Sequence, residues 1–154
     1  MIAVIQRVTG ASVEADGEPY SEIGQGLLVL LGVASTDNEK DAALLSKKIA
    51  GLRIFSDAED KLNLSVSDIG GEILVVPNFT LLASYKKGSR PDFLNSAKPD
   101  EANRLFEHFC SLISEAGIKT SHGKFRSSMK VELVNDGPIT IVMDSRVLRG
   151  EREV

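Results

Sequence analysis

Apolar residues along the chain form runs of two kinds, and the first kind predicts β-strands. The runs at 2–8 and 26–33 are nearly unbroken. The second has so few polar positions that we expect a strand covered on both faces. The stretch at 9–25 alternates weakly and contains turn residues, which predicts a strand or hairpin at the margin of the sheet. Residues 52–55 predict a further short strand.

The second kind of run repeats every three or four positions and predicts two helices. Thr36 and Glu39 have the spacing of a capping box, and the apolar positions that follow end at Gly51. The first helix is therefore expected at 37–50. The second is expected to begin at Pro99, which suits a first turn. Its buried stripe is expected to comprise Ala102, Leu105, Phe106, Phe109, Ile113 and Ala116.

Between the helices, one apolar run is broken in an informative way. Residues 56–71 are polar and predict a loop or a short hairpin, and the apolar run 72–82 follows. Pro77 lies inside that run, and its missing N–H means that the strand ends, reaches an edge or bulges there. Residues 83–98 then have the composition of an exposed loop, and sites commonly lie on such loops.

Near the end of the chain, two short apolar runs predict a closing hairpin. The runs are 130–134 and 139–144, and Asp136-Gly137 between them is a strong two-residue turn signal. Pro138 conflicts with this signal, because it removes an N–H that the returning strand needs. Residues 146–154 are charged and lack apolar periodicity, so we expect them to fray.

The order of these elements predicts a mixed α/β fold. A single domain is expected at 1–145, with a charged C-terminal tail at 146–154. Two helices cannot cover both faces of a large sheet, so part of the sheet must pack on another sheet or on another copy of the chain. We therefore expect two packed β-sheets with two main helices, in β/β/α layers.

Composition limits the compartment and the partners. The chain has no run approaching ~20 apolar residues and no signal-peptide pattern at its start, so we expect neither membrane insertion nor export. The single cysteine, Cys110, fits a cytoplasmic protein and is interpreted as a packing residue rather than a catalytic thiol. The net charge of −4 counts against a broad basic surface, although basic residues gather at 86–90 and at 119–130. Without other information, both groups are interpreted as solvated faces.

Familiar catalytic patterns do not account for this chain. His108 and His122 lack a metal-ligand spacing, and no phosphate loop, dinucleotide fingerprint or GxSxG elbow occurs, so no metal and no cofactor are expected. The carboxylates of Asp57, Glu59 and Asp60 belong to a polar segment that would not raise a pKa. What remains is Thr80 beside the break at Pro77. There the backbone N–H groups of Phe79 and Thr80 are candidates for stabilising an oxyanion, with an ordinary strand or core role as the alternative.

Together, several segments resemble the D-aminoacyl-tRNA deacylase family over nearly the whole chain, to about residue 144. Their number, order and spacing are more specific than any single motif. The matching segments are MIAVIQRV, GLLVLLGV, LRIFSDAEDKLNLSV, ILVVPNFTL, KKGSRPDF, HGKFRSSM and VELVNDGPIT. The resemblance implies a homodimer that hydrolyses the ester joining a D-amino acid, or glycine mischarged on tRNA-Ala, to the 3′ end of tRNA. On that basis Lys86, Lys87 and Arg90 become candidates for contacting tRNA phosphates.

The resemblance also implies a role for Gly137-Pro138. In the family this pair has a cis peptide bond and enters the partner subunit's pocket, where its carbonyl groups select against L-amino acids. Selection of this kind excludes the wrong stereoisomer sterically.

One family motif departs from its usual form. Ser-Gln-Phe-Thr-Leu is usual, whereas residues 77–81 are Pro-Asn-Phe-Thr-Leu, and the leading proline resembles a related animal deacylase with another selectivity. By the same resemblance, Asn78, Phe125 and Met129 are candidates for binding substrate. Thr80 matches the family residue natural to propose as nucleophile, but nothing in the sequence supplies an adjacent base. A substrate-assisted reaction is preferred, in which the ribose 2′-hydroxyl helps to activate water.

Three alternatives remain open from the sequence. They are a non-catalytic nucleic-acid-binding module, a deacylase with altered amino-acid selectivity, and a dimeric hydrolase of small metabolites. Selective hydrolysis of D-aminoacyl-tRNA separates the first and the last from the family activity.

Overall fold

The computed structural model describes residues 1–151. Within them, three helices and one turn of 3-10 helix accompany two sheets. The larger sheet comprises β1 (Ile2–Ala15), β2 (Glu18–Ile23), β3 (Gly26–Gly32), β6 (Glu72–Pro77), β7 (Lys119–His122) and β8 (Met129–Asp144). The small sheet is a hairpin of β4 (Phe55–Ser56) and β5 (Leu62–Leu64). The helical elements are α1 (Glu39–Ala50), η1 (Phe79–Leu82), α2 (Pro99–Glu115) and α3 (Ser145–Leu148).

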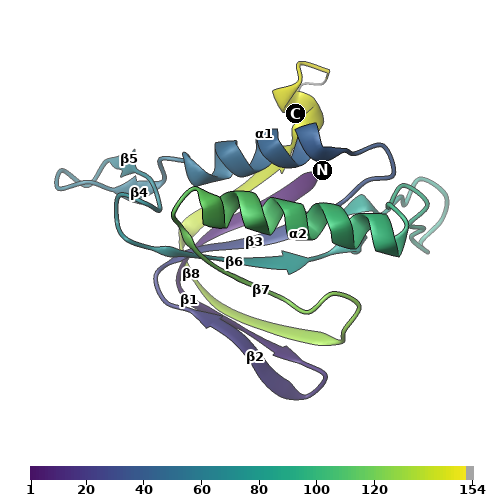
Figure 1. Cartoon of the computed structure of the whole chain (residues 1–154), viewed down its shortest axis with the longest axis horizontal. Helices are drawn as coiled ribbons and strands as arrows, with labels where there is room; N and C mark the ends of the chain where they lie inside the picture. The colour runs from purple at the N-terminus through teal and green to yellow at the C-terminus, as the bar shows by residue number, and fades with distance from the viewer. Residues whose placement is uncertain (152–154) are drawn as a thin grey trace.

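The long strand β1 organises the larger sheet. β8 pairs with one edge of β1 over almost its whole length, and the other edge is divided between β3 and β2. β6 and β7 extend the sheet beyond β3 in parallel pairing. The sheet then curls until its end strands β2 and β7 meet. At their contact, Ser21 Oγ of β2 donates to the His122 carbonyl of β7 at 3.0 Å. Figure 1 shows β2 and the adjoining halves of β1 and β8 beneath β3 and β6, with α1 and α2 above.

This curl corrects the prediction of two separate packed sheets. One continuous sheet supplies both β-layers, because β1 is long enough to belong to each half. Side chains from both halves fill the interior of the curl, and they include Val8, Val13, Leu28, Leu74 and Val76. A larger core lies between the sheet and the helices.

Strand β3 is covered on both faces, as its sequence predicts. Leu27, Val29 and Leu31 belong to the core under the helices. Leu28 belongs to the core inside the curl, and Leu30 packs against it. Alternate side chains of a strand point to opposite faces, so a strand between two cores is apolar at every position.

Both predicted main helices form, but the ends differ from expectation. The first begins at Glu39 and is capped by Asn38 and Asp41, whose side chains accept from the Lys40 and Asn38 N–H groups at 2.9 and 3.0 Å. The predicted Thr36–Glu39 capping box is wrong, because Asn38 offers the same chemistry two residues later. In α2 the predicted stripe is buried except at its ends, where Ala102 is half-buried and Ala116 is exposed.

The predicted closing hairpin is wrong, because both apolar runs belong to the single strand β8. Val131 pairs with Val13 and Ile141 pairs with Ile5, so one strand continues past the turn signal. The pairing jumps from Val8–Asn135 to Gln6–Thr140, and residues 136–139 bulge out between these pairs. β1 holds both sides of the bulge, which allows Gly137-Pro138 to leave the ladder without reversing the chain.

The expectation that the chain frays after residue 145 is wrong for the described part. α3 forms there, and Ser145 is fully buried with its Oγ 2.6 Å from the amino group of Met1. Arg149 Nη1 lies 2.8 Å from Asp41 Oδ1 of α1. The remainder of the predicted tail, 152–154, lies outside the described residues. In residues 1–151, no helix has both the length and the apolar character needed to cross a membrane.

Glu72, at the start of β6, links this strand to β7 and to the turn between β2 and β3. Its carboxylate accepts from the Gly24 N–H at 2.8 Å and lies 2.5 Å from Lys119 Nζ on β7. The Lys119 ammonium, followed by the Gly24 N–H, lowers the pKa of Glu72. A depressed folded-state pKa adds stability above the unfolded-state pKa, and this stability is lost as the pH falls through the folded-state value.

We expect Glu72→Gln to lower the free energy of unfolding by about 1 kcal/mol at pH 7, because the charged partner of these hydrogen bonds is lost. The difference from wild type should shrink below the ordinary carboxyl pKa of 4.5, where wild-type Glu72 begins to be protonated. Urea titrations at pH 7, 5 and 3 measure both effects. Glu18→Gln, at an exposed position of β2, is the control. An equal deficit at all three pH values would contradict the assignment.

Candidate active site

A pocket of about 470 Å³ opens where β3 and β6 end. Four of the residues predicted from the sequence line it: Asn78, Phe79, Phe125 and Met129. Its walls come from β6 and η1, from the loop before α2, from the first turns of α2, and from the segment after β7. Residues 78 and 129 are therefore brought together only by the tertiary structure.

The β6 end is shaped by a strand that stops and a helical turn that starts. The Asn78 N–H donates to the Leu31 carbonyl at 2.8 Å, which is the last link between the two strands. Gly32 makes the close approach possible, because a Cβ there would lie 2.4 Å from Leu82 Cδ2. η1 can therefore turn directly against β3, with Phe79 as its first residue.

Asn78 caps this helical turn and forms hydrogen bonds with the backbone and the side chain of Thr80. Its Oδ1 accepts from the Thr80 N–H at 3.2 Å and also contacts the Thr80 hydroxyl. No described residue accepts from the Phe79 N–H, whereas the Thr80 N–H has Asn78 as its partner. Of the two backbone donors predicted from the sequence, the Phe79 N–H is therefore the one that is available to a ligand in a single chain.

The Phe79 side chain stands at the pocket rim and is 60% exposed. Its ring meets Phe93 edge-on at a centroid distance of 5.0 Å, and Ser96 Oγ donates to the Phe79 carbonyl at 3.2 Å. The hydrogen bond from Ser96 holds the Phe79 backbone, and the contact with Phe93 holds its ring. The loop before α2 therefore helps to orient the unpaired N–H.

Gly137-Pro138 lies outside this pocket, at the other end of β3. The bulge of residues 136–139 sits opposite Arg7, which pairs with Leu27, whereas Asn78 adjoins Leu31. The peptide bond between Gly137 and Pro138 is cis, and both residues are exposed. One chain therefore does not bring the predicted selecting pair to the predicted catalytic residues.

Arg7 holds the base of the bulge. Its Nε donates to the Asp136 carbonyl at 2.8 Å, and its Nη1 donates to the Ile54 carbonyl at 2.7 Å. The Asp136 carboxylate lies 3.2 Å from the same Nε. Glycine also suits position 137, because a Cβ there would lie 2.9 Å from the backbone nitrogen of Ile139. The bulge is thus braced on both sides and presents its tip to solvent.

Comparison with known proteins identifies the family. The family model described as D-Tyr-tRNA(Tyr) deacylase matches residues 4–144. The chain belongs to the D-Tyr-tRNA(Tyr) deacylase family. A relative from Anaeromyxobacter dehalogenans, named D-aminoacyl-tRNA deacylase, is 53% identical over 96% of this chain and 99% of the relative. A relative of the same name from Geobacter sulfurreducens is 53% identical over 95% and 96% of the two chains.

Two solved structures share the fold with this deacylase-family chain. The c-Myc DNA unwinding element binding protein has a TM-score of 0.87 and 38% identity, covering 94% of this chain and 98% of that chain. A probable eukaryotic D-amino acid tRNA deacylase has a TM-score of 0.81 over 92% and 97% of the two chains. The identity to the latter is 16%, so that likeness concerns the fold alone.

In this deacylase-family chain, the predicted basic residues lie beside the pocket rather than in it. Lys86, Lys87 and Arg90 are exposed on the loop after η1, whose ends are joined by the Ser84–Asp92 bridge. Lys86 lines a separate cleft of about 440 Å³. Their predicted contact with tRNA remains a prediction.

Several pocket residues carried no recognisable functional signal in the sequence. Ala102 and Phe106 belong to the predicted stripe of α2, and the first turns of that helix face the pocket as well as the core. Phe93 and Ser96 lie in a loop whose course no local pattern specifies. Arg126 was noted only as part of a basic group, yet it lines the pocket with a positive φ of 61°.

The alternative catalytic groups lie away from the Phe79 N–H. Cys110 is 9% exposed, and its burial, followed by the nearby Glu107 carboxylate, raises the pKa of the thiol to about 12. A thiol with this pKa stays protonated at neutral pH, in agreement with its interpretation as a packing residue. His122 and Cys110 line a second pocket, between α2 and β7, and His108 is half-buried on α2.

Proposed function

We propose that the chain hydrolyses the ester that joins a D-amino acid, or glycine, to the 3′-terminal adenosine of tRNA. The observation that carries this proposal is the unpaired Phe79 N–H at the rim of a pocket, in a chain 53% identical to proteins named D-aminoacyl-tRNA deacylase. The aromatic side chains of Phe79, Phe93, Phe106 and Phe125 give the pocket surfaces for a nucleobase.

The reaction needs an acceptor for developing negative charge. Water attacks the ester carbonyl carbon, the carbonyl oxygen becomes an oxyanion, and the ribose 3′-oxygen departs with a proton. The Phe79 N–H is the donor available for that oxyanion. The Thr80 N–H becomes a second donor only if it exchanges its bond to Asn78 for one to the substrate.

The activation of the attacking water is assigned to the substrate and not to a side chain. The described residues lining the pocket include no carboxylate and no imidazole, and Arg126 cannot act as a base at neutral pH. The Thr80 hydroxyl is bonded to Asn78 and has no basic neighbour in the pocket. The ribose 2′-hydroxyl next to the ester supplies the remaining polar group that can orient water.

Chiral selection is proposed to require a second copy of the chain. The pocket and the exposed bulge at 136–139 lie at opposite ends of β3, so the bulge can enter only the pocket of another protomer. Leu30, Val4 and Val142 are paired across three strands and face away from the helices. Val142 is 57% exposed, so this apolar row offers a surface for the second copy. Pro138 carbonyl and ring atoms would then leave no room for an L side chain.

The loop with Lys86, Lys87 and Arg90 is proposed to contact tRNA phosphates. These side chains are exposed beside the pocket, on the loop that leaves η1. Contacts of this kind position an RNA without reading its sequence.

A second candidate function is nucleic-acid binding without catalysis. It is favoured by the likeness to a 38% identical protein that is named as a DNA unwinding element binding protein. The departure at Pro77-Asn78 from the usual family motif is also compatible with it. The first experiment below separates the two functions.

We expect purified protein to release D-tyrosine from D-tyrosyl-tRNA and to act at least about 100-fold more slowly on L-tyrosyl-tRNA, the ratio supplied by about 3 kcal/mol of steric exclusion. Acid-gel or radiolabel assays measure both rates under single-turnover conditions. Tight tRNA binding without ester hydrolysis would support the non-catalytic alternative instead. Equal cleavage of free D-tyrosine esters would support a small-metabolite hydrolase.

Thr80→Ala should retain most of the deacylase rate, within about fivefold of wild type, because the proposed chemistry uses no side-chain nucleophile. A D-aminoacyl-tRNA ending in 2′-deoxyadenosine should be cleaved at least about 100-fold more slowly, since the group that orients water is missing. Single-turnover rates on both substrates give the comparison. A folded but inactive Thr80→Ala protein would overturn the substrate-assisted scheme.

Mixed dimers test whether the bulge acts on the partner. Ala102→Trp should fill the pocket and abolish activity, whereas deletion of Gly137-Pro138 should leave a pocket that accepts L-aminoacyl-tRNA. In heterodimers purified with two affinity tags, the working pocket belongs to the deletion chain and the intact bulge to the Ala102→Trp chain. We expect these heterodimers to cleave D-aminoacyl-tRNA and to reject the L form. Cleavage of both forms would mean that the bulge acts within its own chain.

A further inference from the structure

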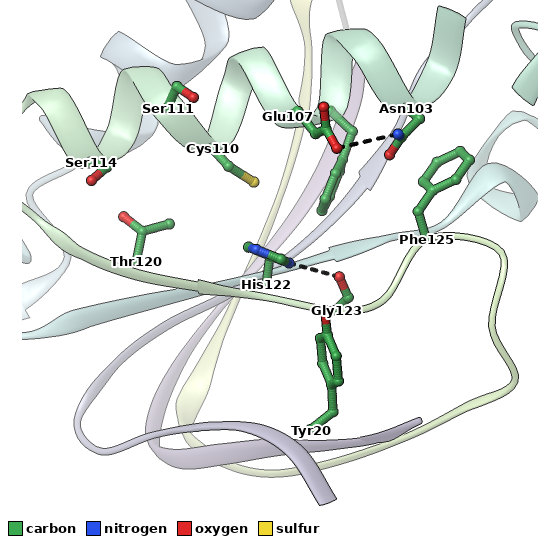
Figure 2. A pocket seen from close by; sticks show the side chains of 11 residues that line it. Tyr20, Asn103, Glu107, Cys110, Ser111, Ser114, Thr120, His122, Gly123 and Phe125 are labelled. Atoms are coloured by element: carbon green, nitrogen blue, oxygen red, sulfur yellow. Dashed lines mark hydrogen bonds between the residues drawn. The ribbon is translucent and has the colours of Figure 1, made fainter. Parts of the chain in front are cut away.

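A second pocket of about 590 Å³ lies between α2 and β7, next to the candidate active site (Figure 2). The two pockets share Phe106 and Phe125, whose ring centroids are 6.3 Å apart. Because both pockets border on these two rings, a ligand that extends past the rings from one pocket reaches the other. Nothing in the proposed hydrolysis uses this second pocket.

Aromatic rings line the path through the second pocket. The His122 ring lies 6.3 Å from Phe106, and the Tyr20 ring lies 6.3 Å from His122 on the opposite side. Tyr20 is 45% exposed, so its ring is accessible at the mouth. A succession of accessible rings along a groove is the surface on which unpaired bases stack.

Glu107 and His122 give the pocket hydrogen-bond acceptors, beside hydroxyl and amide groups that can both donate and accept. Glu107 on α2 accepts from Asn103 Nδ2 at 3.3 Å and keeps further acceptor capacity on its exposed carboxylate. His122 Nδ1 lies 2.9 Å from the Gly123 carbonyl, which can only accept, so Nδ1 carries the proton. Nε2 of the neutral ring is then an acceptor as well. A flat ring with an exocyclic amino group complements the rings of the pocket and these two acceptors.

We propose, on the basis of the deacylase function above, that this pocket binds the base of the nucleotide preceding the terminal adenosine of tRNA. In the CCA end that tRNAs share, this base is cytosine, and its N4 amino group donates to Glu107. A carboxylate accepting from cytosine N4 is an established mode of base recognition. Arg126 directly follows Phe125 at the junction of the pockets, where the phosphate linking the two nucleotides passes.

The test uses RNA microhelices carrying D-tyrosine, chemically attached to ends that read CCA or CUA. Uracil replaces the amino group by a carbonyl oxygen, which would face the Glu107 carboxylate without a hydrogen atom. We expect wild-type protein to prefer CCA over CUA about tenfold in kcat/KM, within the range of one base contact. In Glu107→Gln, the side-chain amide can donate to the uracil oxygen, so the preference should fall to about onefold.

Glu115→Gln, the same change at an exposed position of α2 outside the pocket, is the matched control and should keep the wild-type preference. A wild-type enzyme indifferent to CCA and CUA, or a preference unchanged in Glu107→Gln, overturns the subsite while ester cleavage upholds the deacylase. Affinities for uncharged CCA and CUA microhelices provide the same contrast without catalysis. Loss of cleavage with a retained, Glu107-dependent CCA preference would overturn the deacylase and uphold the subsite.

Discussion

The division of β1 between two sets of partners is the constraint on which the rest of the structure depends. β8 follows one edge of β1, while the other edge pairs with β3 in its first half and with β2 in its last residues. Strands twist, so a strand of this length carries its two halves into different layers. The sheet closes on itself where Ser21 meets His122, and its interior becomes a second core.

This closure decides where chemistry can occur. β3 and β6 are buried on both faces, and their side chains are used for packing. The candidate active site is therefore built mainly from the segments that follow their ends. Asn78 and Gly32 turn the chain there, and the segment after β7 brings Phe125 and Met129 over the opening. The wall of rings that completes the site also forms one side of the second pocket. The proposed binding of two successive nucleotides depends on this shared border between the pockets.

The same strand separates the two halves of the proposed selective site. Arg7 and the bulge at 136–139 lie at one end of β3, and Phe79 lies at the other. A rigid sheet cannot bring its own ends together, so the proposed chiral selection by Gly137-Pro138 would require a second protomer. The argument for a second copy therefore comes from the geometry of one chain.

The sequence by itself determined the features that depend on neighbouring residues. These include the two main helices, the buried character of β3, an interruption of the apolar run at Pro77 and the packing role of Cys110, because periodicity and missing donors act locally. The segments that resemble the deacylase family also contain Asn78, Phe79, Phe125 and Met129, which line one pocket. Tertiary structure alone decided that residues 130–144 form one strand and not a hairpin. The local turn signal at Asp136-Gly137 is real, but the hydrogen bond from Arg7 to the Asp136 carbonyl joins residues 129 positions apart, and no local pattern encodes that contact.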